Sequence, residues 1–508
     1  MNKQLSFLKD AFKSCDDVIF KAFRISNMNS YLIYLSNLVN KQAIFEVEQD
    51  LITFLIGNTE WNDISTIDVK TKDSFITQMH HRPFFSQKIE VNNTKFIVEQ
   101  ILSGQAVLMV EEIDVAFSFR TKHSAGRAIE EPETEHVIRG PREGFVESID
   151  TNVMLIRRKI KTTSLKIEYL TLGKQTQTKL AVVYLKGVVD ETLVNEVRKR
   201  LSRIEIDGIL ESSYIEAMIQ DAPLSPFPTI FNTERPDRLC AGLLEGKVAI
   251  LTEGTPFTLT MPAVFIEFLH SNDDYYNGGF PSSIVRWIRG LGLLVALILP
   301  AFFIAILTIH QELLQSPFLI RISGNREDLP YPVLIESIFM IMTFELLREA
   351  GQRMPRLFHG SVITLLGILI IGQIAAQSGL VAPLTVVVIG VASLTTFILP
   401  NHAFQQVIRY LCLPMLLLAG LFGFMGILIG LMVILTHLIN LRSFGIPYLS
   451  PISPSRKEGW KDVFLRTPWW AMDTRDPAVG VSNLRRSGDD NFPKPPTHQP
   501  KENQNEIE

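Results

Sequence analysis

The sequence predicts an α/β cytoplasmic module of two subdomains followed by an all-α polytopic membrane domain. At least four long apolar runs lie between Ile288 and Leu441, and roughly 18 to 20 apolar residues are enough to cross the hydrocarbon core of a bilayer. Charged residues gather before and after this region, although the whole chain of 508 residues has a mean hydropathy of +0.18. Before the apolar runs, helix-like and strand-like segments alternate, which is typical of layered α/β domains.

Residues 1–120 form the predicted N-terminal α/β subdomain. Met1–Ser14 has the pattern of an amphipathic helix and lacks the continuous apolar core of a signal peptide, so we expect no cleaved leader. Asn40–Ile56 also has helical periodicity. The β-rich runs that predict strands are Ser30–Leu35, Gln105–Val110 and Val115–Phe119.

Residues 121–147 lose apolar periodicity and collect glycine, proline and charge, so they are predicted to be a linker. The second α/β subdomain is expected at residues 148–285. There Ala181–Leu185 predicts a buried strand, and Asp190 stands where the N-cap of the amphipathic helix Thr192–Ile204 belongs. The alternation of helix-like and strand-like segments favours a mostly parallel sheet.

Charge and motifs exclude several classes of function. A net charge of -4 and a pI of about 6.2 give no basic surface, so no nucleic-acid partner is expected. Gly246 and Lys247 resemble part of a phosphate-binding loop, but Val248 stands where Ser or Thr is required. His80 and His81 are adjacent and would point apart on a helix or a strand. We therefore expect no enzyme, no cofactor, and no catalytic, cofactor-binding or metal-binding residues.

Residues 286–441 form the predicted membrane domain, with four or five spans. The first span is expected at Leu291–Ile309, and Arg286 and Arg289 before it place the N-terminal module in the cytoplasm by the positive-inside rule. The last apolar run, Leu411–Leu441, is longer than one span needs, and its glycines lie three or four residues apart, which allows close helix packing.

The tail, residues 442–508, is also predicted to be cytoplasmic. Its basic residues gather between positions 456 and 466, which favours the same side of the membrane as the N-terminal module. Two termini on one side require an even number of crossings. From about residue 480 the chain is rich in Pro, Asn, Asp and Gln, which predicts disorder.

The apolar run Pro332–Leu347 carries ionisable residues at membrane depth. Glu336, Glu345 and the following Arg348 are candidate buried membrane charges. A carboxylate at this depth is costly, so it normally faces protein or a water-filled path. The alternative is a segment at the interface or inside the bundle, with Glu345 paired to Arg348 one turn on.

Ser361–Gln377 is the predicted pore-lining helix, and a tight hairpin joins it to the next apolar run, Gly379–Leu399. One face is apolar at one end and carries amides at the other, as expected where a hydrophobic constriction gates by dewetting. The alternative is ordinary helix packing, with Gly367 and Gly372 as points of close approach. The candidate pore-lining residues are Val362, Leu366, Leu369, Gln373 and Gln377.

Short sequence blocks between about residue 140 and residue 477 resemble the signature blocks of one family. They follow in register and in the same order, which chance similarity does not produce. The blocks are Pro141–Phe145, Asp221–Pro223, Pro226–Thr229, Thr233–Asp237, Leu244–Ile250, Asp274–Tyr276, His310–Leu313, Phe344–Gly351 and Thr467–Trp470. On these blocks the chain resembles the A subunit of the GerA-type spore germinant receptors.

The resemblance implies a subunit of a nutrient-sensing complex in the inner membrane of a bacterial endospore. It implies a transporter-like B subunit and a lipoprotein C subunit as partners, together with membrane lipid and further copies of the same chain. It also implies that sensing of a germinant triggers ion release, with the A subunit as the channel former. Two alternatives stay open, a membrane-anchored scaffold and a secondary transporter component of the receptor complex.

Overall fold

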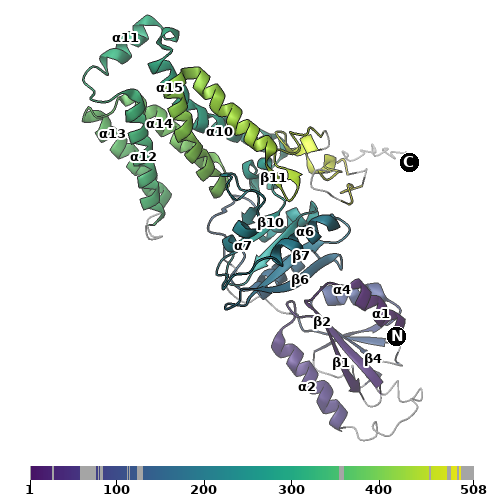
Figure 1. The fold of residues 1–508 in the computed structure, drawn as a ribbon. Coiled ribbons are helices and arrows are strands. Elements are labelled where there is room, and N and C mark those ends of the chain that lie inside the picture. Colours follow the sequence, from purple (N-terminus) through teal and green to yellow (C-terminus); the bar gives the residue numbers. More distant parts are fainter. Residues whose placement is uncertain are drawn as a thin grey trace, which may run out of the picture.

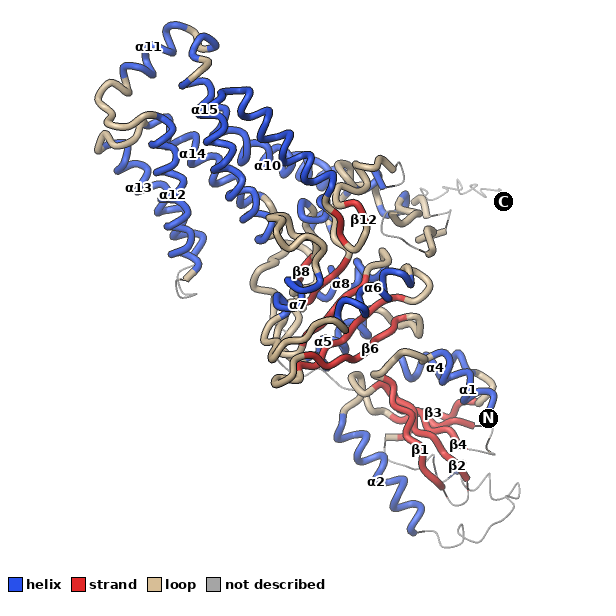
Figure 2. The backbone as a smooth tube through the Cα atoms, in the orientation of Figure 1, coloured by secondary structure: helices blue, strands red, loops and turns tan. Residues whose placement is uncertain are grey.

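The structure, a computed structural model, describes residues 2–25, 28–57, 76–77, 79, 84–110, 113, 115–122, 130–353, 360–456, 459–476, 482–488 and 491–493. Two α/β subdomains follow one another from the N-terminus, and a helical region extends beyond the second of them (Figure 1). After the last helix the chain returns to the second subdomain, where the tail lies (Figure 2).

The first subdomain is a five-stranded antiparallel sheet, in the order β1-β2-β4-β5-β3, with helices on both faces. Successive residues of a strand point to opposite faces. Leu108 and Phe117 therefore pack with α2, whereas Val107 and Met109 pack with α1 and α4. Its elements are α1 (Asn2–Ala11), β1 (Val18–Ile25), β2 (Met28–Leu35), α2 (Lys41–Gly57), β3 (Phe85–Glu90), α4 (Thr94–Leu102), β4 (Ala106–Val110) and β5 (Val115–Phe119).

The second subdomain repeats this architecture. Its sheet has the order β6-β7-β9-β10-β8, which is again first, second, fourth, fifth and third strand. Helices α5 and α8 cover one face, and α6 and α7 cover the other. Its elements are α5 (Ile149–Lys159), β6 (Leu165–Leu172), β7 (Thr178–Leu185), α6 (Glu191–Leu201), α7 (Ser212–Ile219), β8 (Phe231–Thr233), α8 (Pro236–Leu244), β9 (Val248–Thr252), β10 (Thr258–Met261) and the 3-10 helix η2 (Phe265–Leu269).

The predicted mostly parallel sheet is wrong, because every described strand pair of the second sheet is antiparallel. The sequence pattern revealed β7 but not its hairpin partner β6, and β9 forms a second hairpin with β10. Two strands joined by a helical crossover can lie parallel to each other, whereas two strands joined by a hairpin are antiparallel. The predicted cap is confirmed, since the Asp190 carboxylate accepts a hydrogen bond from the Thr192 N–H.

A buried ion pair joins the two subdomains. Arg157 of α5 donates two hydrogen bonds of 2.8 Å to Asp17, and both side chains are fully buried. Beside this pair, Cys15 forms a parallel β-bridge with Ile167 of β6. Met154 of α5 belongs to the core between the first sheet and α1 and α4. The second subdomain therefore completes the core of the first.

The described part of the predicted linker, residues 130–147, packs against the second subdomain. Arg235 at the start of α8 donates hydrogen bonds to the backbone carbonyls of Glu135 and Pro141, at 3.1 and 2.7 Å. The N–H of Phe145 donates to the carbonyl of Glu234. These contacts fix residues 130–147 to the second subdomain.

Part of the tail is also held, although its composition predicts disorder from about residue 480. The N–H of Ser482 donates to the carbonyl of Val188 at 2.9 Å, and Arg486 forms an ion pair with Glu245. Specific polar contacts thus hold residues 482–488 against the second subdomain, in a segment that has little apolar surface to bury.

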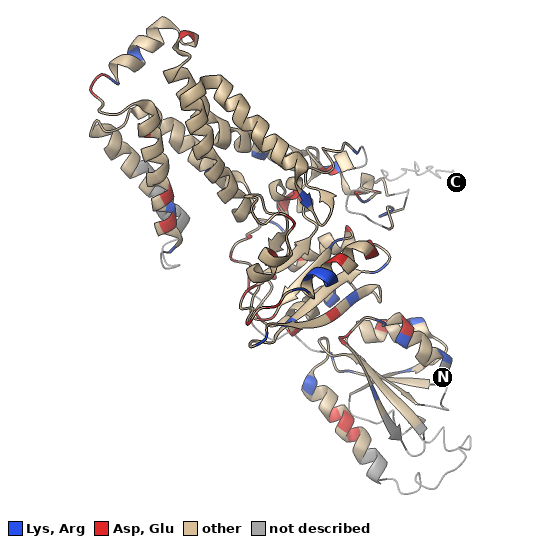
Figure 3. Cartoon of the chain, viewed as in Figure 1, with Lys and Arg blue, Asp and Glu red and all other residues tan. Residues whose placement is uncertain are grey.

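The helical region has a proximal end, beside the second subdomain, and a distal end, where α11 lies (Figure 1). Charged residues are sparse in it and gather at α11 and at the proximal end of α12 (Figure 3). The short helix α9 (Asp273–Tyr276) lies before this region and ends the second subdomain. The elements of the helical region are α10 (Gly279–Thr308), η3 (Gln311–Leu313), α11 (Ser316–Gly324), α12 (Val333–Gln352), α13 (Gly360–Gln377), α14 (Pro383–Thr395), η5 (Thr396–Ile398) and α15 (His402–Asn440); the short strands β11 (Arg442–Ser443) and β12 (Ile446–Pro447) follow.

Helix α15 is broken at Gly423, which has φ 60° and ψ -136°, a conformation that glycine adopts most easily. Beyond the break the chain folds back on itself. A Cβ added at Gly426 would collide with the carbonyl oxygen of Leu418, and one added at Gly430 would collide with Met415. The long apolar run is therefore two antiparallel arms, residues 402–422 and 424–440.

Within the described residues, two helices are long and apolar enough to cross a membrane by length and composition alone. They are α10 and α15, in which an 18-residue window has a mean hydropathy of 2.7 and 2.6, respectively. Helix α14 with η5 is a shorter apolar helix, Pro383–Ile398. By this criterion the expected four or five spans are represented by two helices, one of which is the hairpin.

Candidate functional site at the base of the helical region

A buried cluster of charges, here called the joint, connects the second subdomain, the first long helix and the tail. Its members are Asp274, Arg286, Arg289 and Asp462. Asp274 lies on the short helix α9, and Asp462 lies in the tail. The two arginines are three residues apart on α10, so they point to the same face of that helix.

The geometry of the joint satisfies most of its charged groups. Arg289 donates hydrogen bonds of 2.6 and 2.8 Å to Asp274, and Arg286 lies 3.3 Å from the same carboxylate. Arg286 also donates to the Asp462 carboxylate at 2.8 Å. Burial alone would raise the pKa of Asp274, but the hydrogen bonds and charge of Arg289, with the charge of Arg286, hold that pKa below its ordinary value.

These contacts give Arg286 and Arg289, which were used to predict the membrane orientation, a structural role as well. They were expected to stand as cytoplasmic charges before the first span. Instead α10 begins at Gly279, and both arginine side chains are buried and paired, with 2% of Arg286 and 8% of Arg289 exposed. The positive-inside rule counts Lys and Arg and is not a net-charge rule, so this pairing leaves the predicted orientation unchanged as a prediction.

A hydrogen-bonded network extends the joint into the tail. The hydroxyl of Tyr275 donates to Asp462 at 2.7 Å, and Nε2 of His270 lies 3.1 Å from the carbonyl of Val463. Burial and the nearby Arg286 lower the pKa of His270 to about 4. The imidazole is therefore neutral near pH 7, and its contact with a carbonyl assigns the proton to Nε2.

Further contacts hold the start of α10 to the tail, and the chain just after α15 to the second subdomain. The N–H of Arg466 donates to Oγ of Ser283 on α10 at 2.8 Å. A Cβ added at Gly279 would lie 2.7 Å from the carbonyl oxygen of Arg466, so this close approach requires glycine. Just after α15, Oγ of Ser443 accepts a hydrogen bond of 3.0 Å from the N–H of Ala263. The first and last helices are thus fixed to the second subdomain.

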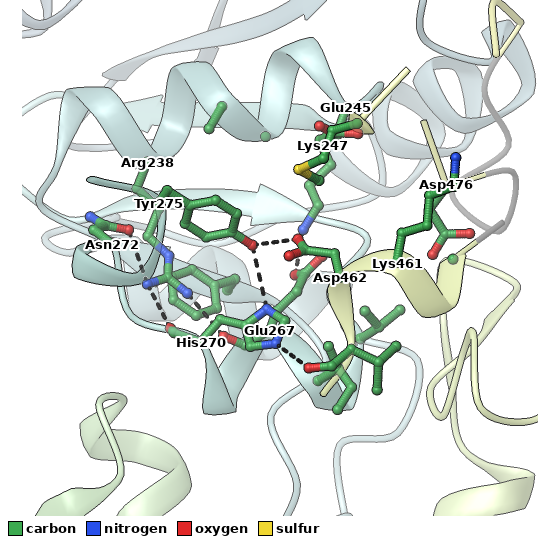
Figure 4. A pocket seen from close by; sticks show the side chains of 18 of the residues that line it. Arg238, Glu245, Lys247, Glu267, His270, Asn272, Tyr275, Lys461, Asp462 and Asp476 are labelled. Atoms are coloured by element: carbon green, nitrogen blue, oxygen red, sulfur yellow. Dashed lines mark hydrogen bonds and ion pairs between the residues drawn. The ribbon is translucent and has the colours of Figure 1, made fainter. Parts of the chain in front are cut away.

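Next to the joint lies a pocket of about 280 Å³ between the second subdomain and the tail (Figure 4). Two ion pairs stand in its wall, Lys247 with Glu267 and Arg486 with Glu245. Lys247, which resembled part of a phosphate-binding loop, is therefore neutralised by a carboxylate. The pair of Arg486 with Glu245 joins the tail to the second subdomain, whereas Lys247 and Glu267 both belong to the second subdomain.

The candidate membrane charges lie at opposite ends of α12. Glu336, 1% exposed, lies at the distal end and pairs with Arg326 at 2.7 Å; it also accepts a hydrogen bond from the hydroxyl of Thr385 at 3.2 Å. At the proximal end, the predicted pair of Glu345 with Arg348 is present at 2.9 Å. The structure therefore brings Glu345 and Arg348 together and separates them from Glu336.

The candidate pore-lining residues are only partly described. The backbone of α13 is helical from Gly360 to Gln377, but the side chains of Val362, Leu366 and Leu369 lie outside the described part. Gln373 and Gln377, towards the distal end, are exposed. The apolar end of the predicted pore-lining face therefore remains a prediction from the sequence.

The glycines of α13 lie at close contacts with its neighbours. A Cβ added at Gly367 would lie 3.3 Å from Leu347 of α12, and one at Gly372 would lie 2.7 Å from Val386 of α14. This is the arrangement that the packing alternative requires. Packing through the glycines and exposure of the two glutamines occur together on this helix.

Sequence reasoning missed the joint. Its one local signal was the spacing of Arg286 and Arg289, which share a helical face and therefore point to a common partner. That partner, Asp274, lies in one of the sequence blocks that resemble the receptor family, but Asp462 lies 176 residues from Arg286. No local pattern connects residues so far apart.

The fold and the joint define a class of protein in which a folded α/β module is fixed to both ends of an apolar helical region, of the kind that associates with membranes. Comparison with known proteins then gives the family. The sequence profile described as Bacillus/Clostridium GerA spore germination protein matches residues 6–478. The chain belongs to this family, as its sequence blocks predicted.

Individual relatives agree with that assignment. Spore germination protein KA of Bacillus subtilis (strain 168) is 36% identical over 97% of this chain and 89% of that protein. Spore germination protein B1 of the same organism is 35% identical, over 94% of this chain and 96% of that protein. Spore germination protein GerLA of Bacillus cereus is 36% identical, over 82% and 86%.

Among solved structures, the crystal structure of the N-terminal domain of the A subunit of the Bacillus megaterium spore germinant receptor GerK3 is similar to part of the chain. It is 31% identical and covers 52% of this chain and 95% of that chain, with a TM-score of 0.39. The family match beginning at residue 6 also includes the first subdomain, which lies outside the sequence blocks that carried the resemblance.

Proposed function

We propose that this chain is the A-type subunit of a nutrient germinant receptor in the inner membrane of the bacterial endospore. It triggers germination by forming an oligomeric ligand-gated ion channel. Its partners are a transporter-like B subunit, a lipoprotein C subunit, further copies of itself and membrane lipid. The names of its relatives, which are spore germination proteins, support this assignment.

The joint is the observation that carries the proposal. A scaffold needs only an anchor, and a flexible connection would serve it. A receptor must instead transmit a change in its soluble module to its helices, which requires a stiff connection. The buried contacts of Asp274 with Arg289, and of Asp462 with Arg286, connect the second subdomain, α10 and the tail in one polar network.

Both termini are proposed to lie in the cytoplasm. Between the proximal and distal ends the chain runs through α10, α12, α13, α14 and the two arms of α15, which is six runs where four or five spans were predicted; of the described helices, α10 and α15 meet the length and hydropathy criterion for a span. An even number of passes returns the chain to its starting side. Exposed apolar side chains such as Leu291 (62%) and Leu421 (67%) suit contact with lipid. The connection after α12 carries Arg353 and Arg356 and no acidic residue, which favours a cytoplasmic proximal end.

Cysteines introduced at Ser6 and Ser482 should react with a membrane-impermeant maleimide only after the membrane has been opened. Both serines are exposed. The native cysteines are buried, and burial raises the pKa of Cys240 to about 12, so their background reaction is slow. Ser323→Cys, on the distal helix α11, is the positive control and should react in intact cells. Reaction at Ser6→Cys or Ser482→Cys in intact cells would contradict this topology.

The apolar end of α13 is proposed to be the gate. Val362→Ala and Leu366→Ser should let water enter the constriction, because narrow apolar rings hold a pore dry. Spores with either change should lose ions without a nutrient, which potassium release measures. Thr364→Ser, on the other side of the helix, should have a mild effect. If the first two variants hold their ions while Thr364→Ser leaks, the pore must be sought near Glu336 and Glu345.

A further inference from the structure

Two buried arginines meet at the proximal end of the helical region, away from the joint. Arg348 of α12 and Arg409 of α15, here called the arginine pair, share one carboxylate, that of Glu345. The distances to it are 2.9 Å from Nη1 of Arg348 and 3.4 Å from Nε of Arg409. Only 4% of the Arg348 side chain and 7% of the Arg409 side chain are exposed, against 32% for Glu345.

The arginine pair is incompletely satisfied. The Nε–H groups of both arginines are buried and make no hydrogen bond among the described residues, since the 3.4 Å approach of Arg409 Nε to Glu345 is an ion-pair contact without hydrogen-bond geometry. Two guanidinium groups and one carboxylate leave a net charge of +1. Buried charges are normally paired, so within the described part of the chain the cluster lacks one anion.

The surface beside the arginine pair is apolar. The guanidinium of Arg348 lies 4.9 Å from the centre of the Phe397 ring. That ring ends a stripe of exposed side chains along α14, with Val387 59%, Val391 43%, Leu394 41% and Phe397 39% exposed. Steps of three and four residues keep these side chains on one face. A ligand with an anionic head and apolar chains fits both features.

We propose that the arginine pair binds the phosphate of an acidic phospholipid, whose acyl chains lie along the α14 stripe. The single charge of a phosphodiester neutralises the cluster, and its oxygens accept the two unused Nε–H groups. The proximal end is at headgroup depth in the topology proposed above, on which this inference rests, and basic pockets at the cytoplasmic ends of helices suit such headgroups. Glu345 competes with the phosphate for the same two arginines.

The test uses the full-length protein, purified in detergent and stripped of lipid. Native mass spectrometry follows binding of phosphatidylglycerol, with phosphatidylcholine and inorganic phosphate as separate arms. Phosphatidylglycerol should bind at least about tenfold more tightly than phosphatidylcholine, and Arg348→Gln and Arg409→Gln should each weaken it by at least about tenfold, as expected for loss of a charged hydrogen bond. The control Arg353→Gln removes an arginine that is 80% exposed and should leave the affinity unchanged.

A variant that gains affinity for phosphatidylglycerol cannot be explained by unfolding, so one such variant is included. Glu345→Gln removes the competing carboxylate, so it should bind phosphatidylglycerol more tightly than the wild type does. Equal affinity for the two lipids, or unchanged affinity in both arginine variants, would overturn the proposal. Displacement of phosphatidylglycerol by an equal concentration of inorganic phosphate would assign the site to a free phosphate instead.

Three further outcomes are informative, and the last two separate this inference from the proposed membrane placement on which it rests. If Arg409→Gln changes only the number of copies per particle, the arginine pair serves contact between copies and the proposal is wrong. Reconstitution into phosphatidylcholine vesicles without any preference for phosphatidylglycerol would refute the lipid site while leaving the membrane placement intact. Failure to enter vesicles of either lipid would refute both.

Discussion

Asp274→Ala should abolish the nutrient response and lower the stability of the joint by about 3–5 kcal/mol, the usual cost of breaking a buried ion pair. The change leaves Arg286 and Arg289 buried without the carboxylate that Arg289 contacts at 2.6 and 2.8 Å. Thermal unfolding of the full-length protein in detergent should show a fall in Tm on the order of 10 °C. Germination of spores that carry the variant measures the response.

The matched control for Asp274→Ala is Glu205→Ala. The ion pair of Glu205 with Lys174 leaves 79% of the glutamate side chain exposed, so its loss should cost less than about 1 kcal/mol. Because the pKa of Asp274 is lowered in the folded protein, its stabilisation is present above the ordinary carboxyl pKa and is lost as the pH falls through the folded value. If the Asp274→Ala variant has the wild-type Tm and germinates normally, the joint does not transmit the nutrient response.

Asp17→Ala should separate the two subdomains far more readily than any surface change. In the native protein, burial lowers the pKa of Arg157, but the charge and hydrogen bonds of Asp17 raise that pKa above its ordinary value. In the variant, Arg157 would be a buried charge without this partner. Losing about 3–5 kcal/mol from the contact should raise the rate of protease cleavage between the subdomains by about a hundredfold to several thousandfold, if cleavage follows the population of the opened form. Limited proteolysis of the full-length protein measures that rate.

A double variant distinguishes an unpaired charge from a general packing defect. Asp17→Leu with Arg157→Met replaces the buried pair by apolar side chains of similar size and should recover most of the lost stability. The control Glu143→Ala breaks a partly exposed pair with Lys159 and should leave cleavage nearly unchanged. Rapid cleavage in the double variant as well would mean that packing, not the stranded charge, holds the subdomains together.

Patterns along the chain predicted much of the local structure. The amphipathic spacing of Leu5, Leu8 and Phe12 predicted a helix whose apolar face is buried, and all three side chains are buried in α1 or beside it. The capping role of Asp190 and the pair of Glu345 with Arg348 were also predicted, because both depend on residues within one helical turn. The short sequence blocks between about residue 140 and residue 477 were enough to identify the family.

The sheet topology could not be predicted in the same way. Alternation along β7 shows which residues are buried, but it does not show which strand lies beside it. Strand β6 was overlooked: charged Lys166 and Glu168 interrupt its first half, and only its first three residues are buried. Without β6, the hairpin of β6 with β7 could not be recognised. The shared strand order of the two subdomains therefore became apparent only in the assembled sheets.

By itself the sequence determined the two-part organisation, the apolar helical region, the local caps and pairs, and the family. Tertiary structure alone decided the antiparallel sheets, the reversal at Gly423, the partner of Glu336 and the joint. The physical reason is range. Periodicity and capping act between neighbours in the chain, whereas a contact such as that of Arg286 with Asp462 depends on how distant segments fold together and exclude water.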